Sequence, residues 1–121
     1  MEPENNETVA AVGPDALAGE FAEQMRECSL AASVYLKALS HPDRLMILCH
    51  LIEGERTVTE LEHLVGTRQS SVSQHLAKLR GQDIVSTRRE GKAVHYSISD
   101  VRTREIMLLL HKLFLPSTST E

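Results

Sequence analysis

The sequence predicts one mainly α-helical domain that contains five helices and a single β-hairpin. Three observations lead to this fold class. Apolar residues recur at helical spacing through most of residues 15–115, strict alternation replaces that spacing between residues 84 and 98, and glycine or proline separates the segments. The 121 residues are 41% hydrophobic and include no Trp, two Tyr and two Phe, so we expect a single aliphatic core.

A long first helix is predicted for residues 15–39 from the spacing of its apolar residues. Before it, residues 1–14 are polar, charged and interrupted by glycine and proline, so we expect a disordered acidic tail. A Ser-His-Pro sequence at 40–42 ends the first helix. Pro42 suits the first turn of a second helix, where its missing N–H is not needed, and Gly54 marks the end of that helix.

Two short helices joined by a tight turn follow. Thr57 and Glu60 have the spacing of a capping box, which predicts the start of the first of them, and Gly66 ends it. We expect the second to open at Thr67 or Ser70 and to run to about residue 80. Its inner face is apolar at i, i+4 and i+7, through Val72, Leu76 and Leu79. Two short helices in this arrangement form a helix-turn-helix.

The periodicity changes after residue 81. Residues 84–89 and 93–98 are rich in β-branched side chains, and Glu90-Gly91-Lys92 between them predicts a hairpin turn. A hairpin directly after a helix-turn-helix is a wing, which makes the predicted fold a winged helix-turn-helix.

Asp100 is the predicted N-cap of the last helix, which ends before Pro116. We therefore expect one domain over residues 15–115, with disordered tails at 1–14 and 116–121.

Charge is distributed unevenly along the chain. The net charge is −4, and residues 1–27 carry seven acids against one base. Residues 68–96 instead carry six bases against two acids. Phosphate binding depends on local rather than total charge, so this stripe favours a nucleic-acid partner within an acidic protein.

The outer face of the predicted 69–80 helix carries short polar side chains with amide and hydroxyl groups. Amides and hydroxyls of this kind hydrogen-bond base edges in the major groove, and basic residues near them contact phosphates or the minor groove. A solvated helix face and a charged edge strand are the alternative interpretations. The tight turn, the polar helix and the basic hairpin together favour double-stranded DNA as the binding partner. The predicted contacts are Arg68, Gln69, Ser70, Ser71, Ser73, Gln74, His75, Lys78, Arg80, Arg88, Arg89 and Lys92.

Three stretches in this order resemble the ArsR/SmtB family of bacterial repressors: residues 36–45 (LKALSHPDRL), residues 71–80 (SVSQHLAKLR) and the wing at 84–96. The resemblance covers about residues 25–115, and within the family the chain looks most similar to the NolR, BigR and SqrR type of regulator. It implies a homodimer, formed through the first and last helices, that represses transcription from an inverted-repeat operator.

The metal sites of that family are not intact in this sequence. The thiol-rich site would need cysteines at 59–64, where there are none. The other site would need a His where Arg102 stands and an acid where Phe114 follows His111. We therefore expect no metal and no cofactor.

Cys49 matches the second-helix cysteine of the BigR and SqrR group, and the resemblance implies sensing of reactive sulfur or an oxidant. The partner cysteine of that group is replaced by Leu115. Cys28 substitutes for it only if its Cα comes within ~7 Å of that of Cys49 in the same or the other subunit. Otherwise Cys49 is a small buried apolar residue, and the chain is a NolR-like regulator without an effector.

Other classes of function are disfavoured. No nucleophile–base pair, Gly-rich phosphate loop or Cys-x-x-Cys motif points to an enzyme. A winged-helix protein-interaction module remains the alternative, and it would bind DNA weakly. No apolar run approaches the ~20 residues of a membrane span and no secretory signal is visible, so we expect a cytoplasmic protein whose cysteines are thiols.

Overall fold

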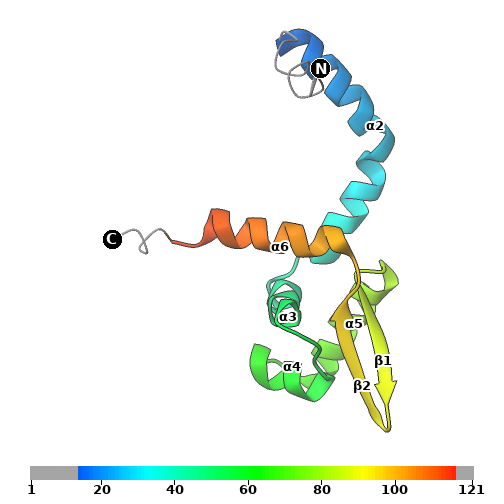
Figure 1. Cartoon of the computed structure of the whole chain (residues 1–121), viewed down its shortest axis with the longest axis vertical. Coiled ribbons are helices and arrows are strands. Elements are labelled where there is room, and N and C mark those ends of the chain that lie inside the picture. Colours follow the sequence, from blue (N-terminus) through cyan, green and yellow to red (C-terminus); the bar gives the residue numbers. More distant parts are fainter. Residues whose placement is uncertain (1–13, 117–121) are drawn as a thin grey trace, which may run out of the picture. The chain divides into compact units, whose positions relative to one another are not determined.

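The computed structural model describes the backbone of residues 14–116 and the side chains of residues 19–116. Over that range five helices and one hairpin follow each other in the predicted order (Figure 1), which confirms the winged helix-turn-helix fold class. The elements are α2 (Pro14–Leu39), α3 (Pro42–Ile52), α4 (Val58–Val65), α5 (Gln69–Gly81), β1 (Val85–Glu90), β2 (Ala93–Ile98) and α6 (Val101–Phe114). The expected tails, apart from Pro14 and Pro116, lie outside the described residues. No described helix is long and apolar enough to cross a membrane.

The chain divides into two compact units, residues 1–36 and 37–121. Within the first, the described part of α2 is a helix with large apolar side chains on its surface. The exposed ones are Phe21, Met25, Leu30, Val34 and Leu36.

In the second unit, α3 packs against α4, α5, β2 and α6. The core between these elements is aliphatic, as the composition predicts. The apolar side chains at most 1% exposed are Ile47, Leu48, Leu51, Leu61, Val72, Leu76, Leu79 and Ile84, and the polar Thr103 is also completely buried. The predicted apolar stripes of the helices therefore supply the core, and the polar face of α5 is left outside.

The starts of α4 and α6 follow local capping rules, with Thr57 and Asp100 as N-caps. The α3 helix ends at Ile52, two residues before the predicted Gly54. Thr57 and Glu60 form the predicted capping box of α4, and Gly66 ends that helix at φ +79°, a conformation that favours glycine. The start of α5 differs, because this helix begins at Gln69 and not at a hydroxyl residue. Its N-cap is Arg68, which has an extended backbone and makes no side-chain capping hydrogen bond.

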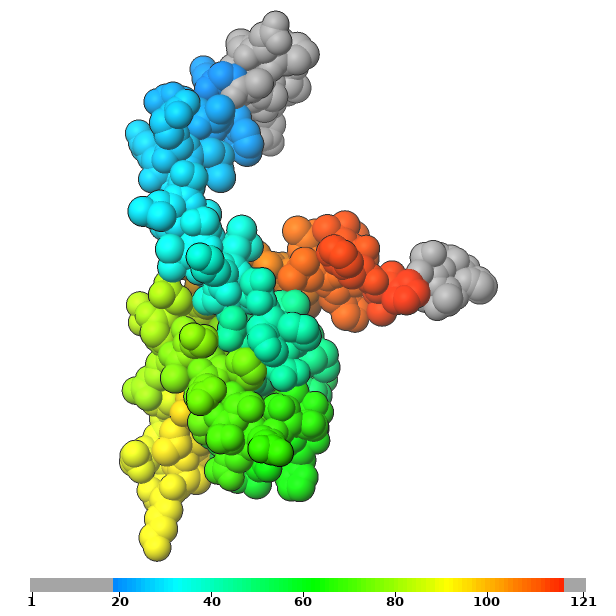
Figure 2. Space-filling view, turned by 180° about the vertical axis from the view of Figure 1, so that it is seen from behind, coloured from blue at the N-terminus to red at the C-terminus, as the bar shows by residue number. Residues whose placement is uncertain are grey.

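The hairpin pairs Val85 with Ile98 at its base and Glu90 with Ala93 at its tip, so its loop is Gly91-Lys92. Gly91 has φ +63°, as the first loop position of a tight hairpin turn requires. The hairpin projects from the body formed by α3, α4 and α5, where it is the yellow extension in Figure 2. Its tip points away from α6 (Figure 1).

Candidate nucleic-acid interface

The α5 helix separates its side chains cleanly into two faces. Val72, Leu76 and Leu79 are completely buried and hold the helix against the core. Most of the predicted base-reading residues lie on the opposite side, where Gln69, Ser70, Ser73 and Gln74 are exposed and Ser71 is half-buried. The amide and hydroxyl groups of this face are therefore free to meet an external partner.

Five of the six basic residues between positions 68 and 96 are also free. Arg68, Lys78, Arg80, Arg89 and Lys92 are exposed. None of them forms a side-chain hydrogen bond or ion pair with the part of the chain that the structure describes. Arg88 differs, because two carboxylates hold its guanidinium.

An open groove of about 340 Å³ lies between α5 and β2. It is lined by Ser73, Leu76, Ala77, Arg80, Gly81 and Tyr96. Ser73 and Arg80 supply a hydroxyl and a guanidinium to this groove. Together they place hydrogen-bond donors between the polar face of α5 and the hairpin.

His75 lies differently from the other predicted contacts. Its side chain is 13% exposed, and its ring centroid is 4.4 Å from that of His41. Its Nδ1 lies 3.2 Å from Nη1 of Arg44. Burial, His41 and Arg44 all lower the pKa of His75. In the free chain His75 therefore holds α5 against the start of α3.

Arg44 connects three elements. It is nearly buried, and its Nε donates a 2.6 Å hydrogen bond to the carbonyl oxygen of Ala38 in the last turn of α2. Carbonyls in the last turn of a helix have no partner within the helix, so Arg44 satisfies one of them. Through Nη1 the same guanidinium contacts His75 of α5. Sequence reasoning missed this role, because no local pattern links residues 31 positions apart.

His41, Asp43 and His75 bring three potential metal-ligand atoms within 4.8 Å of one another. The two histidines do not offer these atoms freely. The N–H of Asp43 donates to Nδ1 of His41, and Arg44 lies on Nδ1 of His75. A metal ion on Nε2 of His75 would require a proton on Nδ1, where it would face another donor. The cluster is therefore arranged for helix packing rather than for a cation.

The two cysteines are free thiols on different units. Cys28 lies on α2, 3.7 Å from Sδ of Met25. Cys49 lies on α3 and is exposed, unlike the buried apolar residue that was one of the expectations. Burial of part of the thiol and the Glu53 carboxylate raise the pKa of Cys49.

Beside Cys49 is an apolar pocket of about 280 Å³ between α3 and α6. Its lining residues are Cys49, Ile52, Glu53, Met107, Leu108 and His111.

The buried stripe of α5, its outward amides and hydroxyls, and the basic hairpin beside it define a DNA-binding winged helix-turn-helix protein. Comparison with known proteins gives its family. Residues 41–87 match the family of bacterial regulatory proteins called the arsR family. The chain is also 40% identical over 92 residues to the transcriptional activator HlyU of Vibrio cholerae serotype O1, spanning 76% of this chain and 85% of that protein. The chain belongs to the ArsR family and is a DNA-binding transcriptional regulator.

Two solved structures show the same architecture. The crystal structure of the transcriptional repressor BigR from Xylella fastidiosa matches with a TM-score of 0.75 at 38% identity, over 79% of this chain and 98% of that one. The homodimeric winged helix-turn-helix DNA-binding domain of a Mycobacterium bovis protein matches with a TM-score of 0.66 at 28% identity, over 74% and 83% of the two chains. The named relatives are regulators and not enzymes, as the sequence predicts.

Proposed function

We propose that two copies of this chain bind an inverted-repeat operator and repress transcription by excluding RNA polymerase. The observation that carries the proposal is the free polar face of α5 beside unpaired basic residues of the hairpin. In a dimer the two α5 helices enter successive major grooves about one helical turn, ~34 Å, apart. Gln69 and Gln74 read adenine edges, while Arg68, Ser70, Ser71 and Ser73 contact bases and adjacent phosphates.

The phosphate backbone is held by a second set of residues. Lys78 and Arg80 bind it near the end of α5, and Arg89 and Lys92 bind flanking DNA from the hairpin. Each of these cations is exposed and has no partner within the described chain, so none has to break an internal ion pair to reach DNA.

Dimerisation through α2 and α6 is supported by their apolar surfaces. On α6 the exposed side chains include Leu108, Leu109, Leu113 and Phe114, the last of them 78% exposed. Contiguous apolar surface of this kind marks an interaction site. The homodimeric mycobacterial domain offers a parallel for the assembly.

The first experiment is fluorescence anisotropy with reduced protein on DNA upstream of the protein's own gene, against a scrambled duplex, over a series of salt concentrations. We expect tight, salt-dependent and sequence-specific binding. Gln74→Ala should lower the ratio of specific to scrambled affinity by at least about fivefold. Gln82→Ala, an exposed glutamine beyond the end of α5, is the matched control. An unchanged ratio in Gln74→Ala would contradict the role assigned to this residue.

A thiol switch at Cys49 is the second part of the proposal. Its support is the exposed thiol at the edge of an apolar pocket between α3 and α6. An organic disulfide would oxidise the thiols of Cys49 and Cys28 to a disulfide bond while its own S–S bond breaks to release two thiols. A persulfide would do the same and release one thiol and hydrogen sulfide. A coupling free energy of ~1–3 kcal/mol to operator binding would suffice for induction.

Repeating the anisotropy after such treatment tests the switch. Loss of binding in the parent but not in Cys49→Ser supports it, and an equal response of the two proteins contradicts it. Binding that treatment leaves unchanged indicates a repressor without a thiol signal. If the protein bound neither the DNA upstream of its own gene nor any fragment of the genome, a protein-interaction module would be favoured.

A further inference from the structure

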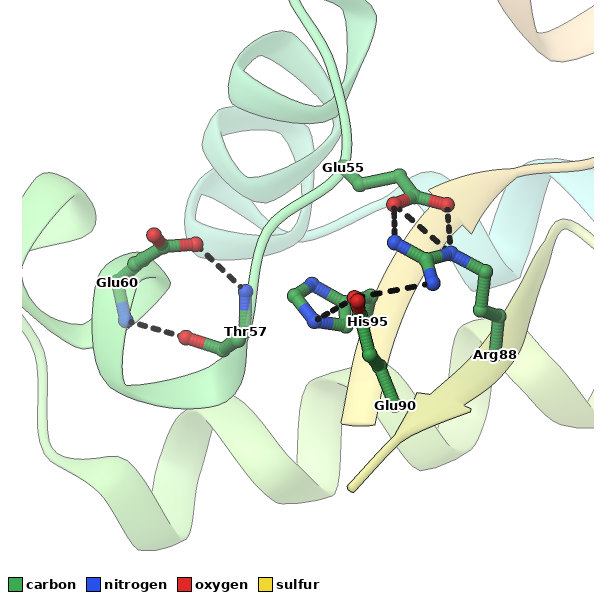
Figure 3. A network of polar contacts seen from close by, with 6 residues as sticks. All are labelled: Glu55, Thr57, Glu60, Arg88, Glu90 and His95. Carbon is green, nitrogen blue, oxygen red and sulfur yellow. Dashed lines mark hydrogen bonds and ion pairs between the residues drawn. The ribbon is translucent and has the colours of Figure 1, made fainter. Parts of the chain in front are cut away.

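Arg88 is set apart from the other basic residues of the hairpin by its partners. Its Nε lies 3.1 and 3.0 Å from the two carboxylate oxygens of Glu55, and its Nη2 lies 2.8 Å from Oε1 of the same residue (Figure 3). Its Nη1 donates to Glu90 at 3.2 Å. A guanidinium held on both edges in this way has a fixed orientation. Arg89, the next residue of the strand, has no such partner within the described chain.

The segment that holds Arg88 is the short connection between α3 and α4. Glu55 binds β1 through Arg88, and Arg56 forms a two-way backbone bridge with Tyr96 of β2, with N···O distances of 3.1 and 2.8 Å. The third residue, Thr57, forms the capping box of α4 with Glu60, as Figure 3 shows beside the ion pair. Three consecutive residues therefore join both strands of the hairpin to the first helix of the helix-turn-helix.

This connection is important because a two-stranded hairpin is marginally stable alone. The bridge at Tyr96 fixes one point on β2, and the ion pair at Arg88 fixes a second point on β1. Two fixed points on neighbouring strands restrict rotation of the hairpin about either one. The hydrogen bonds from Arg88 also lower the pKa of Glu55, so its carboxylate stays ionised to a lower pH than that of an ordinary glutamate.

We propose that Arg88 is a positioning residue and not a phosphate contact: Glu55 and Glu90 hold it so that the hairpin presents Arg89 and Lys92 to DNA. This replaces the expectation that all three basic residues of the hairpin bind DNA, and it rests on the proposed function. Glu55 thereby acquires a part in DNA binding although it is negatively charged.

The salt dependence of operator binding separates the two roles. Log K for DNA binding falls linearly as log salt rises, and each lost phosphate contact makes this slope less steep by about 0.9. A symmetric dimer loses two contacts, so its slope becomes less steep by about 1.8. We expect this decrease for Arg89→Gln. For Arg88→Gln and Glu55→Gln we expect an unchanged slope with binding about two- to fivefold weaker, the equilibrium effect of a surface ion pair. Glu62→Gln removes a carboxylate of α4 that has no partner in the described chain, so its binding should be equal or tighter.

A charge exchange provides the second test. Glu55→Arg combined with Arg88→Glu should bind the operator more tightly than Arg88→Glu alone, because the arginine at position 55 then pairs with a glutamate that otherwise faces two carboxylates, those of Glu55 and Glu90. A glutamate at position 88 facing a phosphate could not give this rescue. The proposal is overturned if Arg88→Gln lowers the slope as Arg89→Gln does, or if Glu55→Gln binds more tightly than the parent.

NMR of the free protein tests the ion pair of Arg88 without DNA, and so independently of the proposed function. The Nε–H signal of Arg88 should be protected from exchange in the parent and lose that protection in Glu55→Gln, with shifts in hairpin amides. An Arg88 signal that exchanges equally fast in both proteins refutes the ion pair whether or not DNA binds. If the signal is protected but no DNA binds, the proposed function fails and the bracing of the hairpin stands.

Discussion

Replacement of Arg44 by methionine should destabilise the fold more than any other change of a charged residue that we consider. The substitution keeps an unbranched apolar stem and removes only the guanidinium. In the parent that group donates at 2.6 Å to Ala38 and contacts His75 at 3.2 Å, and the side chain is nearly buried. Arg44→Met therefore leaves a helix-end carbonyl without its partner and releases His75 from α3.

The size of the effect follows from these two contacts. A hydrogen bond from a charged donor is worth about 1.5–3 kcal/mol. The carbonyl of Ala38 would also stay buried without a partner, so its desolvation cost would no longer be offset. Because the contacts share one guanidinium their effects are not additive, so we expect a loss of about 2–3 kcal/mol in the free energy of unfolding. For a domain of this size that corresponds to a fall of roughly 10–20 °C in Tm.

Thermal and urea unfolding at one fixed protein concentration would measure this loss, since dimerisation makes Tm depend on concentration. Arg104→Met is the control, because Arg104 is exposed and its side chain makes one hydrogen bond within the described residues, at 3.3 Å to the carbonyl oxygen of Ile52. The control should lose about 0.5 kcal/mol or less. If Arg44→Met lost no more than the control, the role given to Arg44 in joining α2, α3 and α5 would be wrong.

Three further predictions concern pH, capping and thiol chemistry. The pKa of His75 is lowered in the folded chain, so the unfolded chain binds its proton more tightly and stability should fall as the pH drops below about 6.5; urea unfolding between pH 5 and 8 should show a smaller fall for His75→Asn. Thr57→Ala should cost about 1 kcal/mol in the same assay through loss of the capping box, whereas the exposed Thr59→Ala should cost little. The raised pKa of Cys49 should make it alkylate more slowly at pH 7.5 than the thiol of an unstructured peptide, and Glu53→Gln should speed the reaction.

The sequence predicts those parts of the fold that depend on neighbouring residues. The spacing of Val72, Leu76 and Leu79 gives the buried face of α5, and Thr57 with Glu60 gives the start of α4, because helical periodicity and capping act within a few residues. The same periodicity leaves the polar face of α5 outside. The DNA contacts assigned to that face remain predictions until binding is measured.

Contacts between distant residues were not predictable in this way. Arg44 meets His75 across 31 positions, and Arg88 meets Glu55 across 33. Residue type and local position place His75 and Arg88 among the predicted DNA contacts but do not reveal their partners within the chain. Which charged groups face one another is decided by the packing of separate elements, and no local pattern records it.

The division of α5 into two faces has a consequence for how this protein can change. Its outward residues, such as Gln69, Ser73 and Gln74, are exposed, so exchanging them should alter stability by no more than about 0.5 kcal/mol. Its inward residues fix the fold and are not exposed to DNA. A duplicated copy of the gene could thus acquire a new operator through a few substitutions on one helix face while the scaffold stays as it is.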